Sequence, residues 1–90
     1  MSAVRIPPTM RTVTSGAKVV EIAGRTVREV VDRLVATYPA LGSQLLDGDG
    51  QINRFVNVFV NDTDVRHLGG LDTPVDDHDA VVLLPAMAGG

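Results

Sequence analysis

The residues with the clearest chemical potential are the last seven, Leu84 to Gly90, which spell LPAMAGG. Glycine has no side chain to bury and loses the most entropy when it is ordered, so Gly89 and Gly90 add nothing to a core. A slim chain end of this kind can enter a narrow channel in another protein, and residues 85–90 span at most about 20 Å when extended. The alternative is a frayed terminus, which is common in proteins.

The group that would react in such a channel is the carboxylate of Gly90. A carboxylate is a poor electrophile, and we therefore expect another enzyme to activate it, typically by adenylation. The remaining tail residues, Pro85, Met87, Ala88 and Gly89, would then stiffen or slim the segment that carries it.

Other side chains that could do chemistry lack the spacing for it. The two histidines, His67 and His78, are accompanied by aspartates in segments rich in turn residues, where aspartate is favoured for backbone reasons. The stretch 47–50, DGDG, starts like a calcium loop, but its glycine is misplaced and no carboxylate closes the loop. The chain has no cysteine and no phosphate-binding glycine motif. We therefore predict no metal site, no bound cofactor and no self-contained enzyme.

Composition narrows the function classes further. The 90 residues fit one domain, and the net charge of −3 removes the basic surface that nucleic acids require. Three aromatic residues, none of them tryptophan, are too few for a base-stacking platform. No apolar run approaches a membrane span and the first ten residues lack a signal core, which predicts a cytoplasmic location and no membrane partner.

Hydrophobic periodicity indicates the elements that would position the tail. Thr26 and Glu29 form a capping-box pattern, and a helical apolar stripe follows them until Pro39. In chain order we expect strands over 3–6 and 18–22, a helix over 27–38, a short helical turn over 40–46, a strand over 52–61, an irregular stretch over 65–75 and a last strand over 80–84.

This order predicts an α+β fold with the first and last strands parallel in the centre of the sheet. It is the ubiquitin-like β-grasp roll, a mixed sheet of four to five strands with one main helix. We expect residues 1–84 to form this domain and residues 85–90 to form a flexible C-terminal tail.

The strand over 52–61 has two different faces. Three alternating valines (Val56, Val58 and Val60) are expected to face the helix, which puts Phe55 and Phe59 on the opposite side. With Leu84 at the base of the tail, these rings predict a partner-binding patch. The alternative is that neighbouring loops cover the rings.

Three stretches carry a resemblance to a known family: RFVNVFVNDTDVR (54–66), GGLDTPV (69–75) and LLPAMAGG (83–90). They resemble the prokaryotic sulfur carriers of the ThiS/MoaD group, in particular actinobacterial carriers that serve cysteine biosynthesis, and the likeness covers nearly the whole chain. The resemblance implies that an E1-like enzyme adenylates Gly90 with ATP and converts it to a thiocarboxylate, which gives its sulfur to a biosynthetic enzyme.

The resemblance leaves several points open. Cysteine synthesis is the favoured destination of the sulfur, but thiamin, molybdopterin or a thio-sugar product would use the same chemistry. Two other functions remain as alternatives: a ubiquitin-like modifier conjugated to lysines, and the small subunit of an enzyme such as molybdopterin synthase.

Overall fold

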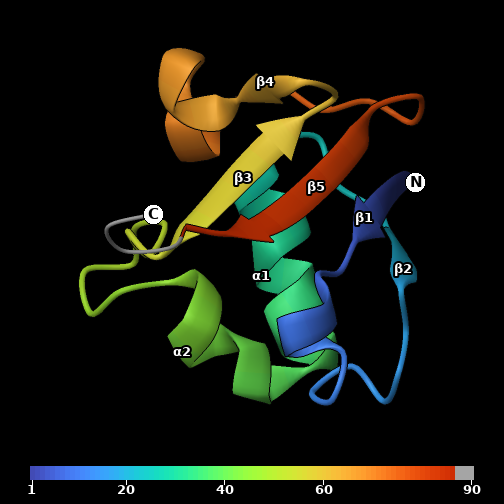
Figure 1. Cartoon of the computed structure of the whole chain (residues 1–90). Coiled ribbons are helices and arrows are strands. Elements are labelled where there is room, and N and C mark those ends of the chain that lie inside the picture. Colours follow the sequence, from blue (N-terminus) through green and yellow to red (C-terminus); the bar gives the residue numbers. More distant parts are fainter. Residues whose placement is uncertain (87–90) are drawn as a thin grey trace.

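The computed structural model describes residues 1–86 of the chain (Figure 1). Its strands are β1 (Ser2–Arg5), β2 (Val19–Ile22), β3 (Val56–Val60), β4 (Thr63–Asp64) and β5 (Ala80–Pro85), and its α-helices are α1 (Val27–Thr37) and α2 (Gly42–Leu45). Short 3-10 helices lie at Pro8–Met10, Pro39–Leu41, Val65–His67 and Gly70–Asp72. None of the helices within residues 1–86 is long and apolar enough to cross a membrane.

The five strands form one mixed sheet in the order β2-β1-β5-β3-β4. The N-terminal hairpin is antiparallel, β1 and β5 are parallel, and β3 is antiparallel to both β5 and β4. α1 lies behind the sheet and crosses β3 and β5 (Figure 1). The predicted hairpin, the central parallel pair and the ubiquitin-like β-grasp arrangement are therefore confirmed.

The core lies between α1 and the sheet. Burial alternates along β3 and β5, so that one face of each strand contacts the helix and the other does not. The buried residues at this contact are Val27, Val30, Val31 and Leu34 of α1, Val56, Val58 and Val60 of β3, and Val81 and Leu83 of β5. The predicted apolar stripe of the helix and the predicted buried face of β3 are confirmed.

The start of α1 is held by both local and distant contacts. The Thr26 hydroxyl accepts a hydrogen bond from the Glu29 amide at 3.3 Å, which is one half of the predicted capping box. The Val27 amide donates to the Thr73 carbonyl at 3.0 Å, which fixes the helix to the segment before β5. Gly24 also packs closely here, because a Cβ atom at this position would lie 2.8 Å from a Val30 methyl group.

The strand predicted over 52–61 is shorter in the structure, since β3 begins at Val56. A turn at Asn53 replaces its first part: the Asn53 side-chain oxygen accepts from the Phe55 amide at 2.9 Å, and the Asn53 carbonyl accepts from the Val56 amide at 3.0 Å. Asparagine competes in this way for backbone groups that a strand would pair. The prediction that residues 53–55 are strand is therefore wrong, and Ile52 forms an isolated antiparallel bridge with Leu46 in place of a longer β3.

β3 ends at Val60, one residue before the expected end of the strand at residue 61. Asn61 adopts a φ of 56°, which asparagine tolerates better than most residues, so the chain reverses within two residues. The chain then pairs again at once, and Thr63 and Asp64 form β4 at the edge of the sheet. With β4 the sheet has five strands, within the four to five that we expected.

We predict that Val58→Asp unfolds the domain. Val58 is 2 % exposed in the middle of β3, and its replacement would bury an unpaired carboxylate. The expected loss is about 3 to 5 kcal/mol of the free energy of unfolding, a large share of the total for a small domain. Thermal or urea denaturation followed by circular dichroism measures it.

Asn57→Asp is the matched control, because residue 57 lies on the opposite face of the same strand, where Arg66 contacts its side-chain oxygen. This variant should keep the parental midpoint. An unchanged midpoint for Val58→Asp would show that the two faces of β3 are assigned the wrong way round.

Candidate functional site

The candidate site is the carboxyl end of β5, where the chain leaves the sheet. Pro85 is opposite Val56 in the register of β5 and β3, and the Ala86 amide donates to the Phe55 carbonyl at 2.7 Å. β5 therefore includes Pro85, one residue past the boundary that we expected between sheet and tail. The predicted tail residues Met87, Ala88, Gly89 and Gly90 lie outside the described residues.

The position of this exit is fixed by the sheet. β5 pairs with β1 on one side and β3 on the other, and its core-facing side chains, Val81 and Leu83, are 0 % and 1 % exposed. Burying a side chain of this size stabilises a fold by about 1.5 to 3 kcal/mol. A strand held by two neighbours and a core presents the start of the tail at one defined place.

The three residues predicted to form a partner-binding patch lie around the exit, and we call them the exit patch: Phe55, Phe59 and Leu84. Phe55 is 51 % exposed and Leu84 is 44 % exposed, whereas Phe59 is half-buried. Phe59 is opposite Val82 and Leu84 is opposite Asn57, so Phe59 and Leu84 are diagonal neighbours on the open face. Phe55 precedes β3, and its carbonyl accepts the hydrogen bond from the Ala86 amide.

The exposure of the two rings differs because their backbones differ. Phe59 lies within β3, between strands on both sides, while Phe55 lies in the turn before β3. The Arg54 guanidinium is 5.0 Å from the centre of the Phe55 ring, within the range of a cation–π contact. The accessible apolar surface at the exit is therefore mainly that of Phe55 and Leu84.

Arg66 also contributes to this face, and no sequence pattern predicts a role for it. Its guanidinium donates to the Asn57 side-chain oxygen and, at 2.9 Å, to the Val56 carbonyl, and it lies 3.9 Å from the Asp64 carboxylate. β4 pairs only with Phe59 and Val60, so the Arg66 side chain takes the place of a strand partner beside Val56. No local sequence pattern predicts this contact, because the chain must reverse after β3 and turn again after β4 before Arg66 can reach β3.

The histidines and aspartates that were considered for metal binding occupy turns. His67 ends a 3-10 helix, and the His78 amide donates to the Asp76 carboxylate at 2.9 Å. The Asp79 carboxylate accepts from the Asn61 side chain at 3.0 Å, and this hydrogen bond is the main reason that the pKa of Asp79 is lowered. Within residues 1–86, no three such side chains are grouped so as to hold a metal ion.

The fold and the exit geometry define a class of protein, a ubiquitin-like β-grasp domain whose last central strand ends beside an apolar patch. The model of the ThiS family matches residues 4–90. The chain belongs to the ThiS family.

Individual relatives agree with this assignment. The sulfur carrier protein CysO of Mycobacterium tuberculosis is 45 % identical over 89 residues, which cover 97 % of this chain and 96 % of the relative. The small archaeal modifier protein 3 of Haloferax volcanii is 43 % identical over 65 residues, 72 % of this chain and 70 % of that protein. One chain in the crystal structure of the Amycolatopsis orientalis BexX/CysO complex matches with a TM-score of 0.91 and 42 % identity. The match covers 100 % of this chain and 100 % of the matched chain.

We predict that Arg66→Ala weakens the open face without unfolding the domain. The change removes the donor to the Val56 carbonyl, and because Arg66 is partly exposed the loss should be only about 1 kcal/mol of the free energy of unfolding. Urea denaturation measures it. Arg28 is an exposed arginine on α1, so Arg28→Ala serves as the control and should leave the midpoint unchanged. Equal midpoints for both variants would mean that the hydrogen bond from Arg66 to the Val56 carbonyl does not stabilise the sheet.

Proposed function

We propose that this protein is a sulfur carrier whose Gly90 carboxylate is adenylated by an E1-like enzyme and converted to a thiocarboxylate. The observation that carries the proposal is the geometry of the exit. The sheet holds the chain up to Ala86, whose amide bonds to Phe55, so that four residues remain to reach into a partner. Four residues span at most about 14 Å, which suits an active site at the bottom of a narrow channel.

The chemistry needs a partner that supplies ATP and sulfur. A Gly90 carboxylate oxygen attacks the α-phosphorus of ATP and pyrophosphate leaves, which gives an acyl-adenylate. A sulfide-level nucleophile then attacks the carbonyl carbon: a C–S bond forms, the C–O bond to AMP breaks, and AMP leaves with the electron pair. The carrier is a cosubstrate in both steps, and ATP is bound by the activating enzyme.

The ThiS family and the relatives support this role. The mycobacterial and Amycolatopsis relatives are named CysO, the first of them as a sulfur carrier protein, and the second was crystallised in a complex with BexX. By this likeness we propose that the present carrier also binds protein partners: an E1-like enzyme that loads it and a biosynthetic enzyme that accepts the sulfur. Cysteine biosynthesis is the acceptor pathway that we favour.

The exit patch supplies a docking surface for the loading enzyme. An enzyme that takes up residues 87–90 must contact the surface beside Leu84 and Phe55, because the Ala86 amide is hydrogen-bonded to the Phe55 carbonyl. A few residues near the centre of an interface carry most of its binding energy, and exposed apolar patches often mark such interfaces. The patch therefore adds affinity at the place where the tail enters.

A second function is favoured by one relative. The Haloferax volcanii relative is named a modifier protein, and a modifier uses the same acyl-adenylate but transfers its terminal carbonyl to a lysine amine. The two functions share the fold and the activation step, and they differ in the product.

We predict that Gly90→Val blocks thiocarboxylation and spares the fold. With the activating enzyme, ATP and sulfide, the mass of the parent should rise by about 16 Da as one oxygen becomes sulfur. A side chain at the tip would misplace the carbonyl, and a misplacement of about 1 Å can cost a hundredfold in rate. Intact-mass spectrometry measures the product, and deletion of Gly90 should have the same effect.

The matched control is Gly48→Val, at a surface loop glycine where an added Cβ meets nothing within 4 Å. This variant should be thiocarboxylated like the parent. Equal thiocarboxylation of a folded Gly90→Val variant would mean that the tip does not need to be glycine, and the steric account of the tail would fail. Gel-stable conjugates to other proteins in place of the mass increase would favour the modifier.

We predict that Leu84→Ser weakens binding to the activating enzyme by about tenfold through loss of apolar contact in the exit patch. The free energy of unfolding should change little, because Leu84 is 44 % exposed. Isothermal titration calorimetry with the purified enzyme measures the dissociation constant, and Phe55→Ser and Phe59→Ser should act in the same direction.

Leu68→Ser is the control for this experiment, since Leu68 is 49 % exposed and follows the 3-10 helix after β4. It should leave the affinity unchanged. If Leu84→Ser and Leu68→Ser both bind within twofold of the parent, the exit patch does not dock the enzyme.

A further inference from the structure

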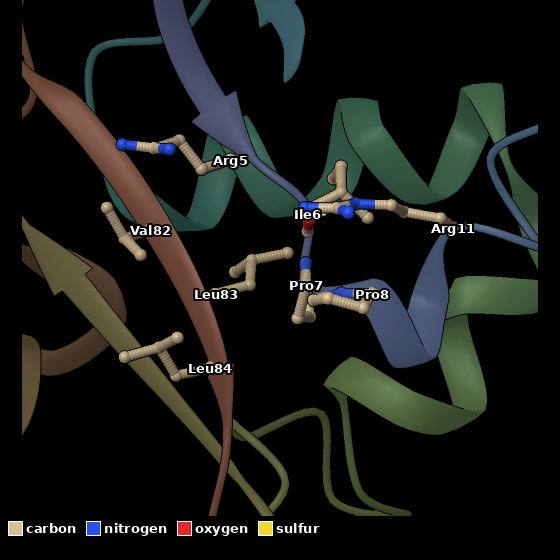
Figure 2. A pocket seen from close by; sticks show the side chains of 8 residues that line it. All are labelled: Arg5, Ile6, Pro7, Pro8, Arg11, Val82, Leu83 and Leu84. Atoms are coloured by element: carbon tan, nitrogen blue, oxygen red, sulfur yellow. Dashed lines mark hydrogen bonds between the residues drawn. The ribbon is translucent and has the colours of Figure 1, made fainter. Parts of the chain in front are cut away.

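A hollow of about 190 Å³ lies beside the exit, between β5 and the chain that follows β1 (Figure 2). Its apolar lining includes the exposed residues Pro8 and Leu84 and the buried residues Pro7 and Leu83, and Arg5 and Arg11 bring positive charge to it. In Figure 2 the Arg11 side chain extends toward Ile6, whereas the Arg5 side chain extends away from Ile6 on the side of β5 near Val82. Leu84 is also a member of the exit patch.

The hollow exists because β1 is shorter than β5. The parallel pairing of the two strands ends at Arg5 and Val82, whereas β5 continues to Pro85. Pro7 has no amide hydrogen to continue the ladder, and the chain turns away into the 3-10 helix Pro8–Met10. Space is thereby left beside the last residues of β5, where a longer first strand would have lain.

The charge around the hollow is opposite to that of the whole chain. The chain has 11 acidic and 8 basic residues, yet the residues that line the hollow include two arginines and no carboxylate. The ion pairs found within residues 1–86 involve neither Arg5 nor Arg11. Arg11 donates from Nε to the Ile6 carbonyl at 3.1 Å, which orients its guanidinium. The remaining N–H groups of a guanidinium suit a carboxylate.

Size and place indicate what occupies the hollow. Pockets for drug-sized ligands are larger, from about 300 Å³ upward, so this hollow fits one or two side chains. It adjoins Leu84, so an enzyme that takes up the tail must bring its own surface over it. Apolar walls beside two cations are complementary to a protein segment that carries aspartate or glutamate among apolar residues.

We propose that the hollow is a docking site for an acidic segment of the enzyme that takes up the tail, with one carboxylate of that segment bound by Arg5 and another by Arg11. This inference rests on the proposed function, since it assumes an enzyme at the exit. The exit patch and the hollow adjoin at Leu84 and would together give the enzyme one extended contact. A contact with an apolar part and a charged part fixes the rotation of the carrier about its tail better than an apolar patch alone.

The test compares charge reversals of equal size. Arg5→Glu and Arg11→Glu should each weaken binding to the purified activating enzyme by about tenfold or more, because a repulsion replaces a charged contact. Arg28→Glu makes the same change of net charge on the exposed side of α1 and should stay within twofold of the parent. Arg5→Glu is the more reliable of the two variants, because Arg11 also holds the Ile6 carbonyl.

A charge reversal in the activating enzyme completes the experiment. One aspartate or glutamate beside its tail channel, changed to arginine, should restore binding to Arg5→Glu and weaken binding to the parent. If folded Arg5→Glu and Arg11→Glu bind like Arg28→Glu while the parent is thiocarboxylated, the docking inference fails and the proposed function stands. If the parent itself is never adenylated, the proposed function fails.

A peptide probe tests the chemistry of the hollow without the enzyme. A short peptide of alternating glutamate and valine should shift the NMR signals of the Arg5 and Arg11 side chains in a saturable way, and one of alternating lysine and valine should not. Equal shifts with both peptides, or with inorganic phosphate alone, would overturn the proposal. So would a change in the same signals when residues 87–90 are deleted, since the chain's own end would then be the occupant.

Discussion

The structure depends on the burial of β5 in the centre of the sheet. This strand pairs with β1 on one side and β3 on the other, and its inward side chains, Val81 and Leu83, contact the core under α1. The pairing continues through Pro85 to the Ala86 amide. Because the last strand of the fold is also the one that leads to the terminus, the stability of the domain and the position of the tail have the same physical origin.

The two faces of the sheet carry different kinds of residue. The face toward α1 carries the valines and leucines that hold the domain together, while the open face carries Phe55, Leu84 and Arg66 around the exit. Alternation along a strand allows this division, since neighbouring residues point to opposite sides. Under the proposed function, changes on the open face would alter partner binding at small cost to the fold.

The features that follow from local patterns could be predicted from the sequence. The apolar stripe of α1, its start at Thr26 and the alternating valines of β3 depend on periodicity and capping, and the structure has them all. The start of β3 was misplaced because the side chain of Asn53 takes the backbone amide of Phe55, which hydrophobicity does not reveal. At residues 53–55 this local hydrogen bond outweighs the strand propensity of the sequence.

The basic groups near the exit could not be predicted in the same way. Arg5 and Arg11 reach β5 only through the parallel pairing of the two ends of the chain, and Arg66 reaches β3 only after two turns. Each of these contacts joins residues that lie in different segments of the chain and share no local sequence pattern. The family resemblance pointed to the chain end and did not assign a role to any of the three.

The central claim is that the sheet holds the chain through Ala86 and that residues 87–90 alone reach the reactive site. The most direct measurement is the rate of thiocarboxylation of a carrier that lacks Met87 but keeps the terminal Gly89-Gly90. Removing one residue withdraws the reactive carbonyl by about 3.4 Å, and the rate should fall by at least about a hundredfold with the fold unchanged. A shortened carrier that reacts at the parental rate would contradict the account, because the sheet would then not set the reach of the tail.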